Sequence, residues 1–192
     1  MPIAAQARAD SSSSREYQIK AAFLYNFIKF VDWPQEKVPD SNEPITIGIL
    51  GKDPFGNAFE PIKDKQVKSR KIVIKRFKNF EELKKSNEKD KTELGREIEA
   101  LRKCHLLFVC SSEKEDLGEI IKALKGSPVL TVGETDDFLE AGGIIKFVIE
   151  EKKVRFEINI TASKRAKLKI RSQLLRLAKK MVKEKPSKGT KS

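Results

Sequence analysis

The chain has 192 residues, of which 39% are hydrophobic and 35% charged, and its 40 Lys and Arg against 28 Asp and Glu give a formal net charge of +12. This length suits one domain with a full hydrophobic core, and the composition is typical of a globular protein with a heavily charged surface. The most apolar stretch, 21–33, is interrupted by Asn26, Lys29 and Asp32. No run approaches the ~20 apolar residues of a membrane-spanning helix, so we expect no such segment.

The amino terminus carries a short pattern that is typical of exported proteins. Ala7-Arg8-Ala9 precedes the polar run 11–14, as at the cleavage end of a secretory signal peptide. We expect residues 1–14 to be a disordered remnant of such a peptide, 15–185 to be a single α/β domain, and 186–192 to be a disordered tail. The alternative is an ordinary Ala- and Ser-rich terminus.

Hydrophobic periodicity predicts the elements in chain order. Apolar residues recur every three or four positions in the first segment, which predicts a deeply packed helix that ends before Trp33-Pro34. Short runs without a polar face predict strands buried on both sides, and strict alternation after residue 153 predicts an antiparallel hairpin. The expected elements are helix 16–31, strand 45–51, a short helix over 54–62, strand 72–77, two short helices within 79–103, strand 105–110, helix 113–125, strand 129–132, helical turns over 136–141, hairpin 144–149 with 154–160, and a helix over 172–184 capped by Ser172.

This order predicts the fold class. Strands and helices alternate up to Val132, which is typical of a parallel sheet with helices on its faces. The hairpin then adds an antiparallel edge. We therefore expect an α/β fold: a mostly parallel sheet flanked by helices, with an antiparallel C-terminal hairpin and a C-terminal helix.

The residues that carry chemistry do not form a recognisable catalytic or metal site. Cys104 and Cys110 lie six residues apart on one predicted strand, so their Cα atoms should be ~20 Å apart, too far for a disulfide. His105 is the single histidine and falls inside the same apolar strand. Ser111 and Ser112 follow it, but the nucleophile-elbow, P-loop and dinucleotide-binding patterns are absent. We expect no enzyme activity, no cofactor, no metal and no disulfide.

Two further surfaces are candidates for ligands. In open α/β sheets ligands bind beyond the carboxyl ends of the parallel strands. The residues there are Gly51, Asp53, Phe55, Ser111, Ser112 and Glu134. A basic stretch runs over 164–185, and it could bind nucleic acid or an anionic surface through the predicted C-terminal helix. The alternatives are ordinary turns at the sheet edge and a solvated Lys- and Glu-rich surface.

Five segments, in order, resemble the YfiR family of periplasmic proteins. The opening helix, with its K-A-x-x-L-Y-N-F-x-K-F-V-x-W-P form, is the most distinctive of them. Together they cover nearly the whole of 16–178. The segments are YQIKAAFLYNFIKFVDWP at 17–34, ITIGILGKDPFG at 45–56, CHLLFVCSS at 104–112, SPVLTVGETDDFLEAGGIIKF at 127–147 and VRFEINITASKRAKLKIRSQLLRLA at 154–178.

The resemblance implies an α/β domain that is exported through a signal peptide and acts in signalling. The best-known members repress a membrane diguanylate cyclase by binding its periplasmic part, an outer-membrane lipoprotein relieves the repression, and members are often dimeric. The family has structural disulfides within a subunit. Here Cys104 matches the family's strand cysteine, but the preceding strand, 71–77, offers no partner, and Cys110 is unusual.

Sequence and resemblance together predict a periplasmic, non-enzymatic regulator that lowers cyclic di-GMP by contact. Its expected partners are the periplasmic segment of a membrane diguanylate cyclase, an outer-membrane lipoprotein and a second copy of the chain, without nucleic acid. The apolar residues of the first helix fill the core or form a partner or dimer interface; the interface candidates are Phe23, Phe27, Phe30 and Trp33. The alternatives are a periplasmic small-ligand receptor and a nucleic-acid or anionic-surface binder.

Overall fold

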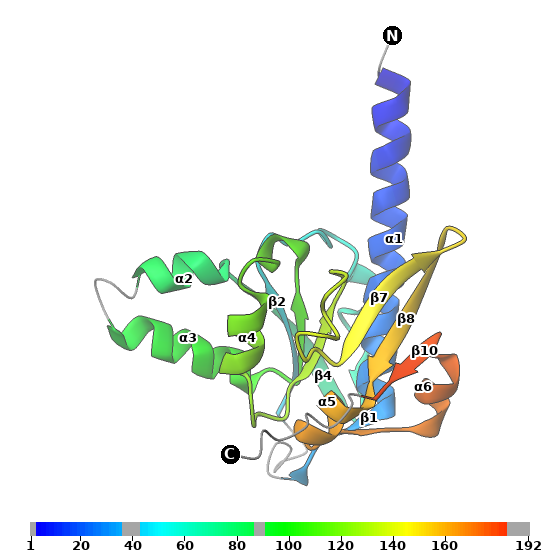
Figure 1. The fold of residues 1–192 in the computed structure, drawn as a ribbon. Coiled ribbons are helices and arrows are strands. Elements are labelled where there is room, and N and C mark those ends of the chain that lie inside the picture. Colours follow the sequence, from blue (N-terminus) through cyan, green and yellow to red (C-terminus); the bar gives the residue numbers. More distant parts are fainter. Residues whose placement is uncertain (1–2, 36–42, 87–90, 184–192) are drawn as a thin grey trace, which may run out of the picture.

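A central sheet of eight strands organises the protein (Figure 1). The structure, a computed structural model, describes residues 3–35, 43–86 and 91–183. The sheet order is β10-β8-β7-β6-β5-β2-β4-β3. The strands are β2 (Ile45–Leu50), β3 (Gln66–Val67), β4 (Arg70–Phe77), β5 (Leu106–Val109), β6 (Leu130–Gly133), β7 (Ile145–Glu150), β8 (Lys153–Asn159) and β10 (Lys180–Val182).

The pairing confirms the predicted fold class. The five neighbouring strands β4, β2, β5, β6 and β7 are parallel to one another. The pairs β7–β8 and β3–β4 are antiparallel hairpins. Every residue of β5 and β6 is buried, as expected for strands covered on both faces. The turn between β7 and β8 places Glu151 and Lys152 at positive φ, the conformation of a tight two-residue hairpin turn.

Helices cover the two faces of the sheet and create two cores. Helix α1 (Ile3–Phe30) packs on one face, where Phe27 belongs to the same core as strand residues such as Ile47 and Phe108. The other face is covered by α2 (Phe80–Ser86), α3 (Lys91–Lys103) and α4 (Leu117–Ala123). Successive side chains of β5 point to opposite faces of the sheet and so contribute to both cores. Leu106 and Phe108 face α1, and Leu107 and Val109 face the other helices.

The C-terminal part closes the α1 side. Helix α5 (Ile160–Arg165) begins directly after β8, and the side chain of Asn159 caps it by accepting a hydrogen bond from Ala162 N at 2.9 Å. Strand β9 (Lys169–Ile170) then pairs with β1 (Val31–Asp32) at the end of α1, and α6 (Ser172–Leu177) contacts α1. Two short 3-10 helices, η2 (Glu60–Ile62) and η3 (Ser111–Glu113), lie in loops.

The predicted C-terminal helix over 172–184 is wrong in its second half. Helix α6 ends at Leu177, Ala178 is extended, and Lys179 N donates to Phe156 O at 2.8 Å, so the chain joins the sheet as β10. The predicted cap by Ser172 is also wrong, since Arg171 is at the N-cap position and its side chain bonds to Asp32 instead of capping the helix. The three residues of β10 form backbone hydrogen bonds at the edge of the sheet beside β8. These bonds stabilise the strand more than the weak apolar pattern of this segment would stabilise a helix.

Other elements also differ from their predicted bounds, among them the helix predicted over 113–125, which begins as α4 only at Leu117. Helix α1 begins at Ile3 rather than near residue 16, because neither Gly nor Pro interrupts 3–30 and four of the first residues are helix-favouring Ala. Its first part projects beyond the body of the protein (Figure 1). The segments 54–62 and 136–141 form turns, with only η2 helical, and the predicted tail over 186–192 lies outside the described residues.

No helix in the described part is long and apolar enough to cross a membrane.

Candidate functional site

The six predicted ligand residues do gather at the carboxyl edge of the parallel strands. Gly51, Asp53 and Phe55 follow β2, Ser111 and Ser112 follow β5, and Glu134 follows β6, whose neighbours in the sheet are parallel. The loops that carry them therefore meet at one end of the sheet. The contacts of each side chain show what this edge can do.

Glu113, which the sequence did not single out, organises the loop after β5. It is only 2% exposed. Its Oε2 accepts a hydrogen bond from Phe80 N at 2.7 Å, and its Oε1 accepts one from Ser112 Oγ at 2.7 Å. Ser112 Oγ in turn accepts from Lys52 N at 3.0 Å. Gly51, at φ +95°, leaves the room for this arrangement, since a Cβ there would lie 2.3 Å from Glu113 Oε1.

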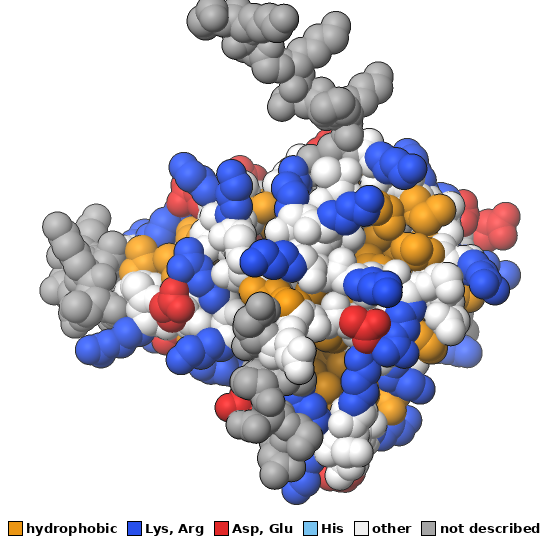
Figure 2. Space-filling model, turned by 90° about the horizontal axis from the view of Figure 1, so that it is seen from below, with side chains coloured by type: hydrophobic (Ala, Val, Ile, Leu, Met, Phe, Trp, Pro, Cys, Tyr) orange, Lys and Arg blue, Asp and Glu red, His pale blue; other side chains and the backbone are white. Residues whose placement is uncertain are grey.

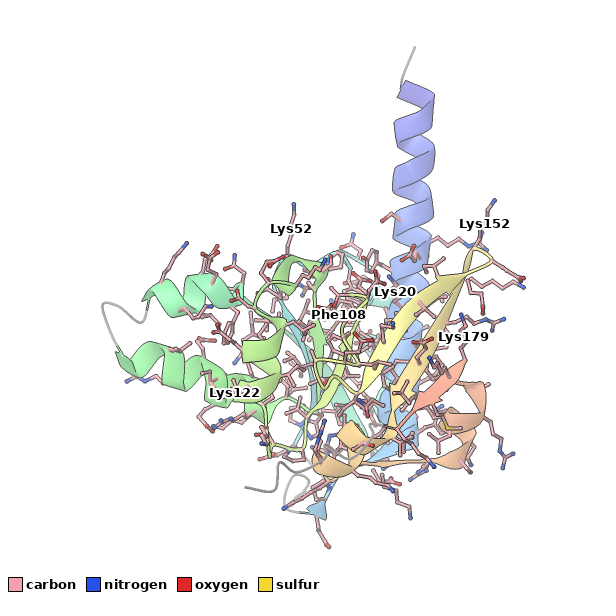
Figure 3. All side chains as sticks on the ribbon, viewed as in Figure 1. Lys20, Lys52, Phe108, Lys122, Lys152 and Lys179 are labelled. Carbon is pink, nitrogen blue, oxygen red and sulfur yellow. The ribbon has the colours of Figure 1, made fainter. Side chains whose placement is uncertain are left out.

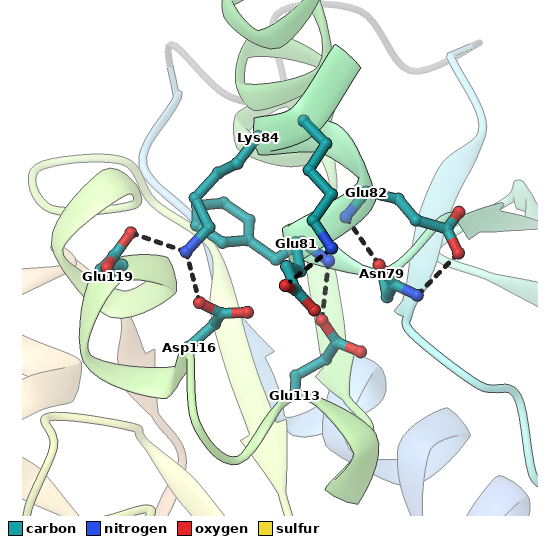
Figure 4. Close-up of polar contacts among 9 residues, drawn as sticks. Asn79, Glu81, Glu82, Lys84, Glu113, Asp116 and Glu119 are labelled. Carbon is teal, nitrogen blue, oxygen red and sulfur yellow. Dashed lines mark hydrogen bonds and ion pairs between the residues drawn. The ribbon is translucent and has the colours of Figure 1, made fainter. Parts of the chain in front are cut away.

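Helix α2 is tied to the same loop from outside. Lys84 Nζ lies 2.5 Å from Asp116 Oδ1 and 3.3 Å from Glu119 Oε2 (Figure 4). The hydrogen bonds raise the pKa of Lys84 above its ordinary value, with Asp116 contributing most. The Phe80–Glu113 bond holds the start of α2 at the loop after β5, and the ion pairs of Lys84 hold the last turn of α2 at the start of α4.

The loop after β2 is fixed by Asp53 and Phe55. Asp53 Oδ1 accepts from Phe55 N at 2.7 Å, and its Oδ2 accepts from Arg76 Nε at 2.6 Å. The Phe55 ring is buried among three other aromatic rings, with centroid distances of 4.7 Å to Phe59, 4.9 Å to Phe108 and 5.2 Å to Tyr17. This predicted ligand residue is therefore part of the core.

Glu134 binds helix α1 rather than facing solvent. Its Oε2 lies 2.5 Å from Lys20 Nζ, and its Oε1 accepts from Tyr17 Oη at 3.0 Å. Lys20, labelled in Figure 3, is only 3% exposed, and it also pairs with Glu16 at 2.5 Å and lies 4.4 Å from the centroid of the Tyr17 ring. Burial, followed by the charge of Glu134, raises the pKa of Tyr17, so its hydroxyl stays protonated and donates.

The edge is therefore a joint between α1 and three loops. Four of the predicted side chains, those of Asp53, Phe55, Ser112 and Glu134, form hydrogen bonds or ring contacts with other parts of the protein. Ser111 and Ser112 are both exposed. Such closed networks hold loops rigidly and leave little hydrogen-bonding capacity for a ligand.

The nucleophile candidates at this edge are not activated. Burial, and then the carboxylates of Asp53, Glu134 and Glu113, raise the pKa of the Cys110 thiol, which keeps it protonated and unreactive. His105 precedes β5 while Ser111 follows it, so the strand separates them by about 20 Å. No group of three or more His, Cys, Asp or Glu within the described ranges could hold a metal ion.

Both cysteines are buried, and neither forms a disulfide. Cys110 belongs to the core on the α1 side, whereas Cys104 belongs to the core under α3 and α4. Residues six apart on one strand would share a face, but β5 starts only at Leu106, so the chain turns between Cys104 and the strand. The two thiols thus lie on opposite sides of the sheet.

The four aromatic interface candidates divide into core and surface. Phe27 is fully buried, with ring centroids 5.0 Å from Phe156 and 5.6 Å from Phe147, so it is a core residue and offers no surface to a partner. Phe23 packs on the same two rings but stays partly exposed. Phe30 and Trp33 are also partly exposed, and Trp33 Nε1 donates to His105 O at 3.1 Å.

Sequence reasoning missed Tyr17, Lys20 and Glu113. A signal for Lys20 exists in the sequence, because it lies three residues after Tyr17 and four before Leu24 on the apolar stripe of the helix. A lysine inside an apolar stripe indicates a buried ion pair. No comparable signal marks Glu113, whose burial depends on where α2 packs.

Comparison with known proteins identifies a family. The model of the YfiR/HmsC-like family matches residues 17–179. Comparison with curated proteins gives no match. Similar solved structures include a conserved domain protein from Vibrio cholerae O1 biovar El Tor (12% identity, TM-score 0.48, 77% of this chain and 57% of that chain). Another is the ABC domain in complex with L-Trp from Streptococcus pneumonia (11% identity, TM-score 0.48, 72% of this chain and 55% of that chain). This chain spans little more than half the length of either.

Proposed function

The chain belongs to the YfiR/HmsC-like family, a family of periplasmic, non-catalytic regulators, and from this membership we propose that it represses a membrane diguanylate cyclase by contact outside the membrane. Repression would lower the cellular level of cyclic di-GMP. The observation that carries the proposal is the family match over 17–179, which spans the sheet and its flanking helices.

The geometry of the sheet edge supports contact rather than catalysis. The side chains that could do chemistry there are bonded within the protein, and the pKa of the Cys110 thiol is raised. A rigid domain of this kind acts by presenting a surface. What remains to be assigned is the surface that the partner would cover.

We propose that this surface is the α1–hairpin patch, formed by Ile19, Phe23 and Ile149. Ile19 is 41% exposed and Ile149 is 54% exposed. Ile19 lies one helical turn before Phe23, and Ile149 lies two residues after Phe147 on the same face of β7. The rings of Phe23 and Phe147 are 6.0 Å apart. The patch would therefore consist of this ring contact and the two exposed isoleucines beside it.

The position of the patch suits a partner segment. The N-terminal part of α1 and the turn between β7 and β8 lie on the same side of the molecule (Figure 1), so a partner there could also reach the projecting helix. Exposed apolar side chains near a fixed helix are typical of protein contact sites. The occupant that we propose is the periplasmic sensor segment of a diguanylate cyclase.

Binding would act by population shift. If the domain binds the inactive conformation of the cyclase segment better than the active one, the equilibrium moves toward the inactive state. A coupling of ~1–3 kcal/mol gives a several-fold change in output. The mechanism requires no chemical step in this chain.

Cyclic di-GMP in intact cells tests the proposal. We expect the level to rise in a deletion strain and to return when the chain is supplied in exported form. The same chain retained in the cytoplasm is the control and should not restore it. An unchanged level in the deletion strain would refute repression.

A further inference from the structure

A cavity of about 320 Å³ lies between α4 and α5, at the opposite end of β6 from the carboxyl edge. Its walls are α4 and the turn after it, the start of β6, the turn before β7, and α5. This volume is at the small end of the range for pockets that bind small molecules, roughly 300–1,000 Å³.

The lining combines an apolar floor with positive charge. Leu124, Val129 and Ile144 are buried core residues, and Lys122, Lys125 and Arg165 add three cations, while the lining contains no carboxylate. Lys122, labelled in Figure 3, and Lys125 are exposed at the end of α4. The Arg165 guanidinium lies across the opening from α5, since its Nη2 is 3.5 Å from the place of a Cβ on Gly142.

Glycines and alanines keep the cavity open. A Cβ on Gly118 would meet no atom within 4 Å, so α4 leaves free space there. Gly142, at φ +102°, makes the sharp turn that brings the loop before β7 close to Ile121 without filling the space. Thr131 adds a buried hydroxyl that accepts from Ile144 N at 3.1 Å and retains its own hydrogen as a donor.

The chain that continues from α5 is also basic. The sequence from 158 to 183 has nine Lys and Arg and no Asp or Glu. Figure 2, seen from below, shows Lys and Arg side chains spread over this side of the molecule with few acidic ones between them. Clustered charge of one sign raises the local concentration of ions of the opposite sign at a concave site.

We propose that this cavity binds a small organic anion, with its apolar ring or short chain on the floor and its charged group beside Lys122 and Lys125. The apolar floor disfavours inorganic anions, which have nothing to bury there. The absence of carboxylates from the lining disfavours cationic and zwitterionic ligands. This site is separate from the α1–hairpin patch, so it can exist whether or not the chain represses a cyclase.

A structural role for the same lysines must be distinguished. Lysines in the last turn of a helix also stabilise it by compensating its dipole. That role predicts no dependence of ligand binding on the two lysines. It also predicts no preference between a charged ligand and its neutral analogue.

Two fluorescent probes with one ring system test the proposal. 8-Anilinonaphthalene-1-sulfonate carries a negative charge, and N-phenyl-1-naphthylamine is its neutral counterpart. We expect the folded full chain to bind the sulfonate at one site. The double variant Lys122→Gln/Lys125→Gln should weaken sulfonate binding at least fivefold and leave binding of the neutral probe within twofold of wild type.

Two further variants locate the site. Lys114→Gln/Lys153→Gln removes the same charge from exposed positions elsewhere and should leave sulfonate binding unchanged. Gly118→Leu fills the open space on α4 and should abolish binding of both probes while circular dichroism stays that of the wild type. Equal weakening by the two lysine pairs, unchanged binding in Gly118→Leu, or a neutral probe that follows the sulfonate in every variant would overturn the proposal.

Discussion

Replacing Lys20 by Met tests the joint between α1 and the sheet edge. Met keeps the length of the buried stem but removes the ammonium group from Glu134 and Glu16, which lie 2.5 Å away. Lys20 is almost fully buried, so its loss leaves the Glu134 carboxylate in a low-dielectric site with Tyr17 as its remaining hydrogen-bond partner. Breaking a buried pair in this way costs ~3–5 kcal/mol of unfolding free energy.

A second substitution separates the charge effect from packing. Glu134→Gln in the Lys20→Met background removes the uncompensated charge and keeps an acceptor for Tyr17, so part of the stability should return. We expect the two changes to couple by ~1–3 kcal/mol in a double-mutant cycle. Urea unfolding followed by circular dichroism gives the four free energies, with an unchanged m-value as the check that the two-state treatment holds.

Additivity of the two substitutions within ~0.5 kcal/mol would refute a direct Lys20–Glu134 interaction. Lys63→Met is the matched control, because Lys63 forms an exposed pair with Glu60 at 3.8 Å. Its effect on stability should be within the error of the measurement.

The remaining predictions concern the core, the thiols and an acidic residue. Phe27→Ala should cost ~3–5 kcal/mol of unfolding free energy, because the ring is fully buried among other rings; urea unfolding measures it, and a loss under ~1 kcal/mol would contradict its place in the core. Cys104 and Cys110 should react with iodoacetamide only after denaturation, as mass spectrometry can show, whereas a disulfide between them would require a different strand. The hydrogen bond from Arg171, followed by that from Lys68, lowers the pKa of Asp32. The ionised carboxylate therefore contributes fully to the stability of the fold above its unfolded pKa of ~3.9, and this contribution is lost as the pH falls through the lower folded pKa. Asp32→Asn should make the free energy of unfolding depend less on pH below about pH 4, and an unchanged pH dependence would mean that the pairs are not formed in solution.

Much of the fold could be predicted because its signals are local. The apolar stripe with Leu24, Phe27 and Ile28 marks α1, and the short apolar runs mark β2, β5 and β6, all of which the structure contains. The alternation in β8 also predicted the hairpin with the correct partner.

The parts that could not be predicted depend on tertiary contacts. Residues 178–182 carry no strong strand pattern, and β10 forms only because β8 offers a free edge beside it. The position of the candidate ligand residues at one sheet edge followed from topology. The bonds of Glu134 to Tyr17 and Lys20, and of Glu113 to Phe80 N, depend on how α1 and α2 pack. The cavity under α4 likewise joins segments that lie 48 positions apart at its extremes, Gly118 and Ala166.

The most direct test of the central claim is the affinity of the purified chain for the periplasmic segment of a diguanylate cyclase from the same organism, measured by calorimetry. We predict saturable binding that Ile149→Glu weakens at least tenfold. Val73→Glu is the matched control, since Val73 is a similarly exposed apolar residue on β4, away from the α1–hairpin patch, and it should bind as wild type does. Absence of wild-type binding, or equal effects of the two substitutions, would contradict regulation by contact through this patch.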